Sequence, residues 1–202
     1  MIGCKRFFQL WSNLSFSIKG GGNIKRNMHV NHLRNGYSAY VFSFFKKHIK
    51  SLDTEMKIGD IGAGHLRNLK LFEELGFKNL YAMDREKTDN PLKVNLKRFV
   101  LQALENGIPF PDRFFDITLC NFVLMFIEDS KIEYVLDELM RVTNVFLIIE
   151  TNKKRHTVKN KTFHKDYDFN HIVNYLKKNP DFEILQVKKS HEKIKIRRKT
   201  DG

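Results

Sequence analysis

The sequence contains little cysteine: Cys4 and Cys120 are its two thiols, and they lie far apart in 202 residues. Two isolated thiols exclude a disulfide framework and a zinc knuckle, so we expect a cytoplasmic protein without a metal site. No apolar run of about eighteen residues occurs, which predicts that no segment spans the membrane. Gln9, Ser12 and Asn13 interrupt the apolar N-terminal stretch and argue against a signal peptide.

Acidic residues are absent from residues 1–50, which hold nine basic ones. Residues 51–152 carry a net charge of −5 and residues 153–202 carry +9, within a total of +13. A compositional bias would act along the whole chain, whereas here the middle is acidic. Basic segments around an acidic core favour an anionic partner or substrate surface.

The length and the 42% hydrophobic content predict one domain with appendages. Residues 1–27 are expected to form a basic amphipathic segment followed by a glycine linker at 20–22. Residues 28–199 are expected to form the domain. Its core would cover residues 56–150, and a loop, a helix and a closing hairpin would occupy 151–199.

Apolar periodicity alternates between strand and helix along this domain. The alternation predicts an α/β fold, a doubly wound and mostly parallel sheet with a C-terminal antiparallel hairpin. Strands are expected at 56–61, 79–83, 97–101, 115–121 and 145–149, with the hairpin at 182–188 and 193–198. Helices are expected at 37–50, 66–75, after a capping box at Ser130, and from a cap at Asp168 through 178.

A glycine turn follows the first expected strand, in the order Asp60-Ile61-Gly62-Ala63-Gly64. Glycine at such a turn lets a ligand approach the backbone closely. A dinucleotide fingerprint would need a further glycine at Arg67, and a P-loop would need Gly-Lys-Ser/Thr. Both are missing, which disfavours a nicotinamide-dependent oxidoreductase and a P-loop nucleotidase.

Asp84 ends the next expected strand, twenty residues after Gly64. A carboxylate there can accept hydrogen bonds from both hydroxyls of a ribose. Together with Asp60 and the glycine turn, Asp84 indicates an adenosine-type ligand.

Residues 108–127 read Ile-Pro-Phe-Pro-Asp-Arg-Phe-Phe-Asp-Ile-Thr-Leu-Cys-Asn-Phe-Val-Leu-Met-Phe-Ile. This stretch resembles a motif of class I, Rossmann-like methyltransferases that use S-adenosylmethionine. With the segment 60–64, Asp84 and the helix end Glu138-Leu-Met-Arg141, the chain resembles the group that methylates small molecules. The resemblance covers roughly residues 38–150.

The resemblance implies that S-adenosyl-L-methionine is the cofactor. Gly62, Ala63 and Gly64 would meet its methionine part, Asp60 would order this loop, and Asp84 would hold the ribose. Leu66 stands where the family has a third glycine, which would tighten the pocket.

Four further positions correspond to cofactor contacts of the family. Gln102 and Ala103 stand where an acidic residue usually meets the adenine amino group, and a Gln carbonyl can accept that hydrogen bond. Asn121 and Phe122 would flank the reacting centre.

Methyl transfer from a sulfonium is an in-line displacement in which the cofactor supplies the reactive carbon. The protein mainly aligns the acceptor in a dry site, so no catalytic dyad is expected and no catalytic residue is assigned. Candidate substrate contacts are His65 beside the glycine turn and His156, His164 and Tyr167 in the loop after the fifth strand. Cys120, within a strand, is expected to be a buried structural thiol.

The acceptor stays open between a small molecule, which the motif slightly favours, and RNA bound by the basic flanks. A non-catalytic module that keeps the fold is a further alternative. Asn121 lacks the Pro-Pro sequence typical of DNA amino-methyltransferases, and neither cysteine follows a proline, as a cytosine-5 enzyme requires. The oligomeric state does not follow from the sequence.

Overall fold

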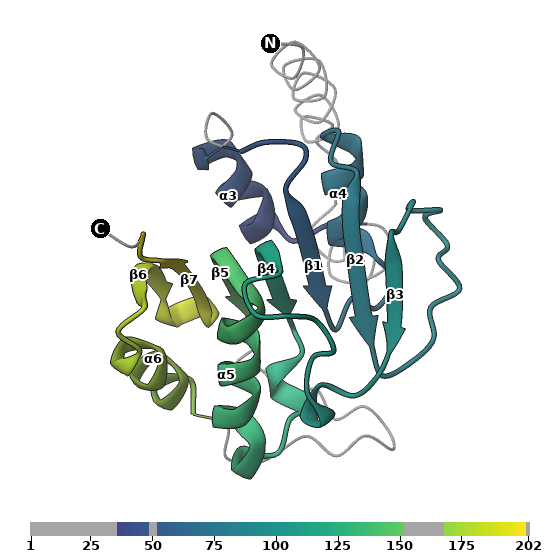
Figure 1. The fold of residues 1–202 in the computed structure, drawn as a ribbon. Coiled ribbons are helices and arrows are strands. Elements are labelled where there is room, and N and C mark those ends of the chain that lie inside the picture. The colour runs from purple at the N-terminus through teal and green to yellow at the C-terminus, as the bar shows by residue number, and fades with distance from the viewer. Residues whose placement is uncertain (1–35, 49–51, 152–167, 201–202) are drawn as a thin grey trace, which may run out of the picture.

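The computed structural model describes residues 36–48, 52–151 and 168–200. A seven-stranded sheet with the order β3-β2-β1-β4-β5-β7-β6 forms their centre (Figure 1). Its strands are β1 (Lys57–Ile61), β2 (Asn79–Asp84), β3 (Arg98–Leu101), β4 (Phe115–Asn121), β5 (Thr143–Glu150), β6 (Phe182–Lys188) and β7 (Lys193–Arg198). The helices are α3 (Ala39–His48), α4 (Arg67–Glu74), α5 (Ile132–Val142) and α6 (Phe169–Lys178). Short 3-10 turns are η2 (Leu104–Asn106), η3 (Leu124–Phe126), η4 (Asp129–Lys131) and η5 (Lys189–His191).

The pairing of the strands confirms the predicted topology. Strands β3, β2, β1, β4 and β5 run parallel to one another, and β7 runs antiparallel to both β5 and β6. The sheet is therefore doubly wound and mostly parallel, with an antiparallel hairpin at its C-terminal side. In this arrangement β7 lies inside the sheet and β6 forms its edge.

Helices cover both faces of the sheet (Figure 1). Apolar residues of α3 and α4 pack with Ile58 of β1, Leu119 of β4 and Ile148 of β5. Apolar residues of α5 and α6 pack with Leu147 and Ile149 on the opposite face. Because side chains alternate along a strand, Phe146 and Ile148 of β5 face α3, whereas Leu147 and Ile149 face α5.

Two expected helix starts have different outcomes. Asp168 caps α6 as predicted, since its side chain accepts a hydrogen bond from the Asn170 N–H. The capping box at Ser130 is wrong: α5 begins at Ile132, and its cap position, Lys131, makes no side-chain capping bond. The chain enters α5 through the turn η4, so Ser130 lies inside that turn and not at the helix start.

The Pro-Phe stretch after β3 is tied to the end of α5 by Arg141. Its guanidinium donates to the carbonyls of Ile108 and Phe110 and pairs with Asp112 and Glu138. Hydrogen bonding from Arg141 lowers the pKa of Glu138, whose carboxylate also accepts the Ile108 N–H. The motif that carries the family resemblance thus has a structural reason, because it fixes a loop against α5.

Two predicted segments, residues 1–27 and most of the loop after β5 (152–167), lie outside the described residues. Within the part of the chain that the structure describes, no helix is long and apolar enough to span a membrane.

Candidate functional site

A cavity of about 370 Å³ opens where β1 and β2 end. Pockets of this size hold small ligands, and in open α/β sheets they lie beyond the carboxyl ends of the strands. Four segments line it: residues 61, 62, 64 and 65 at the end of β1; residues 83–89 at the end of β2; residues 102, 104 and 105 after β3; and residues 122, 123, 126 and 127 after β4.

The glycine turn is fastened to the end of β2. The N–H groups of Gly62 and Ala63 both donate to the Met83 carbonyl, at 2.8 and 3.0 Å. The Gly64 N–H donates to Asp84 Oδ2 at 2.8 Å. These donors are therefore occupied within the chain, and the turn contributes its close backbone surface, not free N–H groups, to the cavity.

The two glycines of the turn are needed for different reasons. At Gly62, with φ of +78°, a Cβ would lie 2.1 Å from Val123 Cγ2, so packing inside the domain already excludes a side chain. At Gly64, with φ of +50°, a Cβ would meet no atom within 4 Å. Gly64 is therefore the glycine whose missing side chain leaves open space at the cavity.

Asp84 is held in a defined orientation at the end of β2. One carboxylate oxygen accepts the Gly64 N–H and the other accepts the Glu86 N–H at 3.0 Å. A carboxylate oxygen has two acceptor sites, so each oxygen keeps one for a ligand. This pair of oxygens fits the two hydroxyls of a ribose.

Asp60 lies beneath the turn and is only 2% exposed. Burial and the negative charge of Asp84 raise its pKa to about 7, against the opposing effects of Arg67 and a hydrogen bond from Asn68. Asp60 does not belong to the residues that line the cavity. When ionised, Asp60 therefore adds negative charge near the cavity without lining it.

Gln102 lies in the cavity wall with its amide group oriented. Its Nε2 donates to the carbonyls of Asn106 and Gly107, at 3.2 and 2.7 Å. The amide oxygen is the acceptor that remains for a ligand donor. Ala103, the neighbouring candidate, is the cap residue directly before η2 and lies outside the lining.

Asn121 and Phe122, at the end of β4, have separate environments. The Phe122 side chain is 39% exposed, lines the cavity and has a positive φ of 60°, a strained conformation for a large residue. Asn121 is buried, and its Nδ2 donates to Glu150 Oε2 at 3.1 Å. The Glu150 carboxylate also accepts from Ser38 Oγ and pairs with Lys193.

Of the nine predicted cofactor residues, five line the cavity: Gly62, Gly64, Asp84, Gln102 and Phe122. Asp60, Ala63, Ala103 and Asn121 lie outside its lining. Of the predicted substrate residues, His65 lines the cavity, whereas His156, His164 and Tyr167 lie outside the described residues.

Glu150, Ser38 and Lys193 were not expected from the sequence as polar neighbours of the site. The sequence contained one signal for this group: Glu150 ends a strand that is otherwise mostly apolar. Cys120 is a free, fully buried thiol whose pKa is raised by burial and by Asp60, as befits a structural residue.

Comparison with known proteins agrees with this geometry. Residues 59–145 match the family model described as a methyltransferase domain. A search of curated protein sequences gave no significant match.

Three solved structures illustrate the likeness of the fold. The Burkholderia thailandensis 1,6-didemethyltoxoflavin-N1-methyltransferase, with bound 1,6-didemethyltoxoflavin and S-adenosylhomocysteine, is 14% identical; 80% of this chain and 78% of that chain align with a TM-score of 0.62. The Synechocystis magnesium protoporphyrin IX methyltransferase, with bound SAM, is 16% identical; 98% of this chain and 92% of that chain align with a TM-score of 0.58. A SAM-dependent methyltransferase from Aquifex aeolicus is 24% identical; 76% of this chain and 87% of that chain align with a TM-score of 0.52.

The sheet order, the cavity beside the glycine turn, and the family match over residues 59–145 lead to one conclusion. The chain has the fold of class I methyltransferases, and residues 59–145 within it match the methyltransferase domain family.

Proposed function

We propose that this protein is a methyltransferase that transfers the methyl group of S-adenosylmethionine to a small-molecule acceptor. The observation that carries the cofactor site is the carboxylate of Asp84, which two backbone N–H groups orient at the rim of a cavity. The two neighbours with named acceptors, a didemethyltoxoflavin and a magnesium protoporphyrin, act on small molecules, and this supports the acceptor class.

The residues present fit the cofactor. Asp84 would accept the ribose hydroxyls, and the amide oxygen of Gln102 would accept the adenine amino group, because its Nε2 is already used by the backbone. Gly64 would leave room for the methionine part. Asp60 would favour a positively charged ligand from beneath the turn.

When bound, the cofactor supplies an electrophilic methyl carbon on a sulfonium, and methyl transfer leaves a neutral thioether. The chain's part is alignment and exclusion of water. Phe122 and Phe126 supply apolar surface at the cavity, and Arg85 lies 5.9 Å from the Phe126 ring centroid.

RNA remains the competing acceptor. Some basic residues near the C-terminus are engaged within the fold: Arg197 pairs with Glu183, and Arg198 donates to the carbonyls of Met140 and Thr143. Their charge is therefore partly neutralised or used to hold β7 in place, which supports the small-molecule proposal.

Two measurements test the proposal. Calorimetry should give binding of S-adenosylmethionine and S-adenosylhomocysteine, weakened by Asp84→Asn. Incubation with methyl-labelled cofactor, separately with a small-molecule extract and with total RNA, should place the label in the small-molecule fraction. Label in RNA alone would refute the acceptor class, and absence of cofactor binding would refute the whole proposal.

A further inference from the structure

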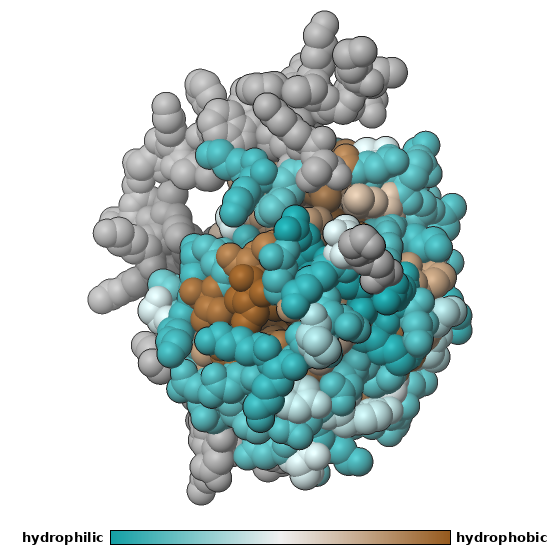
Figure 2. All heavy atoms as spheres, turned by 60° about the vertical axis from the view of Figure 1, so that its left-hand side comes forward, coloured by the Kyte–Doolittle hydropathy of each residue, from teal (hydrophilic) through white to brown (hydrophobic). Residues whose placement is uncertain are grey.

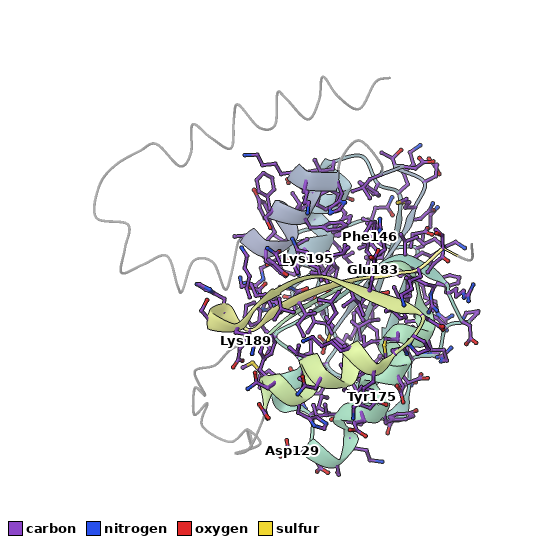
Figure 3. All side chains as sticks on the ribbon, turned by 90° about the vertical axis from the view of Figure 1, so that its left-hand side faces the viewer. Asp129, Phe146, Tyr175, Glu183, Lys189 and Lys195 are labelled. Carbon is purple, nitrogen blue, oxygen red and sulfur yellow. The ribbon has the colours of Figure 1, made fainter. Side chains whose placement is uncertain are left out.

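Lysine side chains lie in one row beside the acidic end of β5. Lys193 of β7 is opposite Glu150, and Lys188 of β6 is opposite Lys193. Lys195 lies two positions after Lys193 and therefore points to the same face of the sheet. Figure 3 shows Lys195 between β7 and α3, and its Nζ donates to Ser43 Oγ of that helix at 3.2 Å.

The ring of Tyr40, from α3, is a common neighbour of these three ammonium groups. The Nζ atoms lie 4.1 Å (Lys195), 5.2 Å (Lys193) and 5.9 Å (Lys188) from the ring centroid. Each distance allows a cation–π contact, but three like charges around one ring also repel one another. Glu150 pairs with Lys193 and so offsets part of the positive charge.

Lys195 is 5% exposed, so burial and the neighbouring positive charges both disfavour its ammonium form. Burial and the positive charges of Lys188, Lys47 and Lys193 lower its pKa to about 8, and Glu150 opposes this shift. Crowding of this kind lowers the stability of the folded protein unless an anion neutralises it. The row is open to such an anion, because Lys188 is exposed and the Lys193 side chain is 18% exposed.

Buried oxygens in need of partners surround the same carboxylate. Within residues 36–48, 52–151 and 168–200, Tyr40 Oη, Asn121 Oδ1 and Thr151 Oγ1 are buried and make no hydrogen bond. Asn121 donates to Glu150, Thr151 follows Glu150 in the chain, and the pKa of Tyr40 is raised by burial and, after it, by the charge of Glu150. Since buried polar atoms almost always have partners, the hydroxyls of Tyr40 and Thr151 point to a ligand acceptor, which an anion supplies. The amide oxygen of Asn121 only accepts, so it needs a donor from another part of the ligand.

We propose that the row of Lys188, Lys193 and Lys195 holds an anionic group, a phosphate or a carboxylate, of the methyl acceptor. This inference rests on the proposed function and names the acceptor class of the same site. The end of β5 lies beside the cofactor cavity, since Asn121, in register with Glu150, directly precedes Phe122 of the cavity lining. The three lysines themselves lie outside that lining. Lys188 and Lys193 contact the anion, and Lys195 adds positive potential from beneath.

Sulfate binding tests the site directly, because sulfate carries the same charge throughout the neutral pH range. In calorimetric titrations Lys188→Gln and Lys195→Met should each raise the Kd for sulfate roughly ten-fold, as expected for the loss of one charge-assisted interaction. Lys178→Gln, an exposed lysine on α6 across the sheet, serves as the matched control and should leave the Kd unchanged. Absence of sulfate binding, or equal weakening by the control, would overturn the proposal.

Lys195→Met also separates anion binding from a purely structural role. Removing one of several crowded positive charges should raise the Tm in anion-free buffer by about 2–4 °C and abolish the further rise that sulfate causes in the wild type. A lysine that only packs against Tyr40 predicts the reverse, a lower Tm with the sulfate response intact. Because the anion favours charged Lys195, wild-type affinity should fall as the pH rises through 8.

The source of the anionic group is tested with a small phosphomonoester and a short single-stranded RNA. The phosphomonoester should compete with sulfate and show the same sensitivity to Lys188→Gln. If the RNA binds through these lysines while the phosphomonoester does not compete, the small-molecule assignment is wrong. Cofactor binding should be unchanged in all variants; its absence in the wild type would contradict the proposed function, whereas its presence without anion binding would contradict the lysine site alone.

Discussion

Asp60→Asn should stabilise the protein at neutral and alkaline pH, although it removes a conspicuous residue of the glycine turn. The folded-state pKa of Asp60 is about 7 and its ordinary value is 3.8, because burial and Asp84 disfavour the charged form. A group whose folded pKa is raised binds more protons when folded, so stability falls as the pH rises from about 4 to about 7. At 1.36 kcal/mol per pKa unit, the full cost above pH 7 reaches about 4 kcal/mol.

Urea denaturation of wild type and Asp60→Asn between about pH 5 and about pH 8 measures this cost. The variant should gain stability relative to the wild type as the pH rises, and most of the gain should appear below pH 7. Asp129→Asn, at an exposed position of η4, is the control and should follow the wild type. A difference between Asp60→Asn and wild type that stays constant with pH would refute the reasoning.

The cofactor adds a second readout for the same residue. S-adenosylmethionine carries a net positive charge, so its binding near Asp60 and Asp84 should favour the ionised form of Asp60. Wild-type affinity should therefore increase as the pH rises through 7, and the increase should be smaller in Asp60→Asn. S-adenosylhomocysteine, which lacks the sulfonium charge, should show a weaker dependence.

Four further substitutions have definite expected outcomes. Asp84→Asn should weaken cofactor binding roughly 10- to 100-fold in calorimetry, because it removes a charge-assisted acceptor; an unchanged Kd would contradict the ribose contact. Gly62→Ala should lower the unfolding free energy by roughly 2–4 kcal/mol, because the new Cβ clashes with Val123. Gly64→Ala should lower the unfolding free energy by about 1 kcal/mol and should mainly weaken cofactor binding. Equal losses of stability in the two variants would contradict their separate roles. Arg141→Met should cost about 2–3 kcal/mol in urea denaturation, since it frees the loop carbonyls; a neutral effect would mean that the loop is held by other contacts.

Much of the fold could be predicted because its strands are buried and apolar. The bounds of β4, β6 and β7 agree with the expected ranges, and β5 extends beyond its expected range at both ends. The start of α5 was wrong because Ser130, a good cap by residue type, is taken into a 3-10 turn. Such a turn depends on how the preceding loop approaches the helix, and this is set by tertiary packing.

The site could be predicted where a contact depends on the end of a single strand. Asp84 and the glycine turn follow from strand ends, and both lie at the cavity. The pairing of Glu150 with Lys193 depends on the register of β5 against β7, which the sequence alone does not reveal. The need for glycine at position 62 likewise comes from Val123, a residue 61 positions away in the chain.

The interior position of β7 has a consequence for synthesis on the ribosome. Residues 193–198 are made after the rest of the sheet, yet they separate β5 from β6. Until they emerge, the apolar strand β5 has an unpaired edge, a template for pairing with another chain. Nascent chains halted before residue 193 should therefore be prone to aggregation and to capture by chaperones, and variants that weaken β7 should reduce the yield of soluble protein more than they reduce the stability of the folded form.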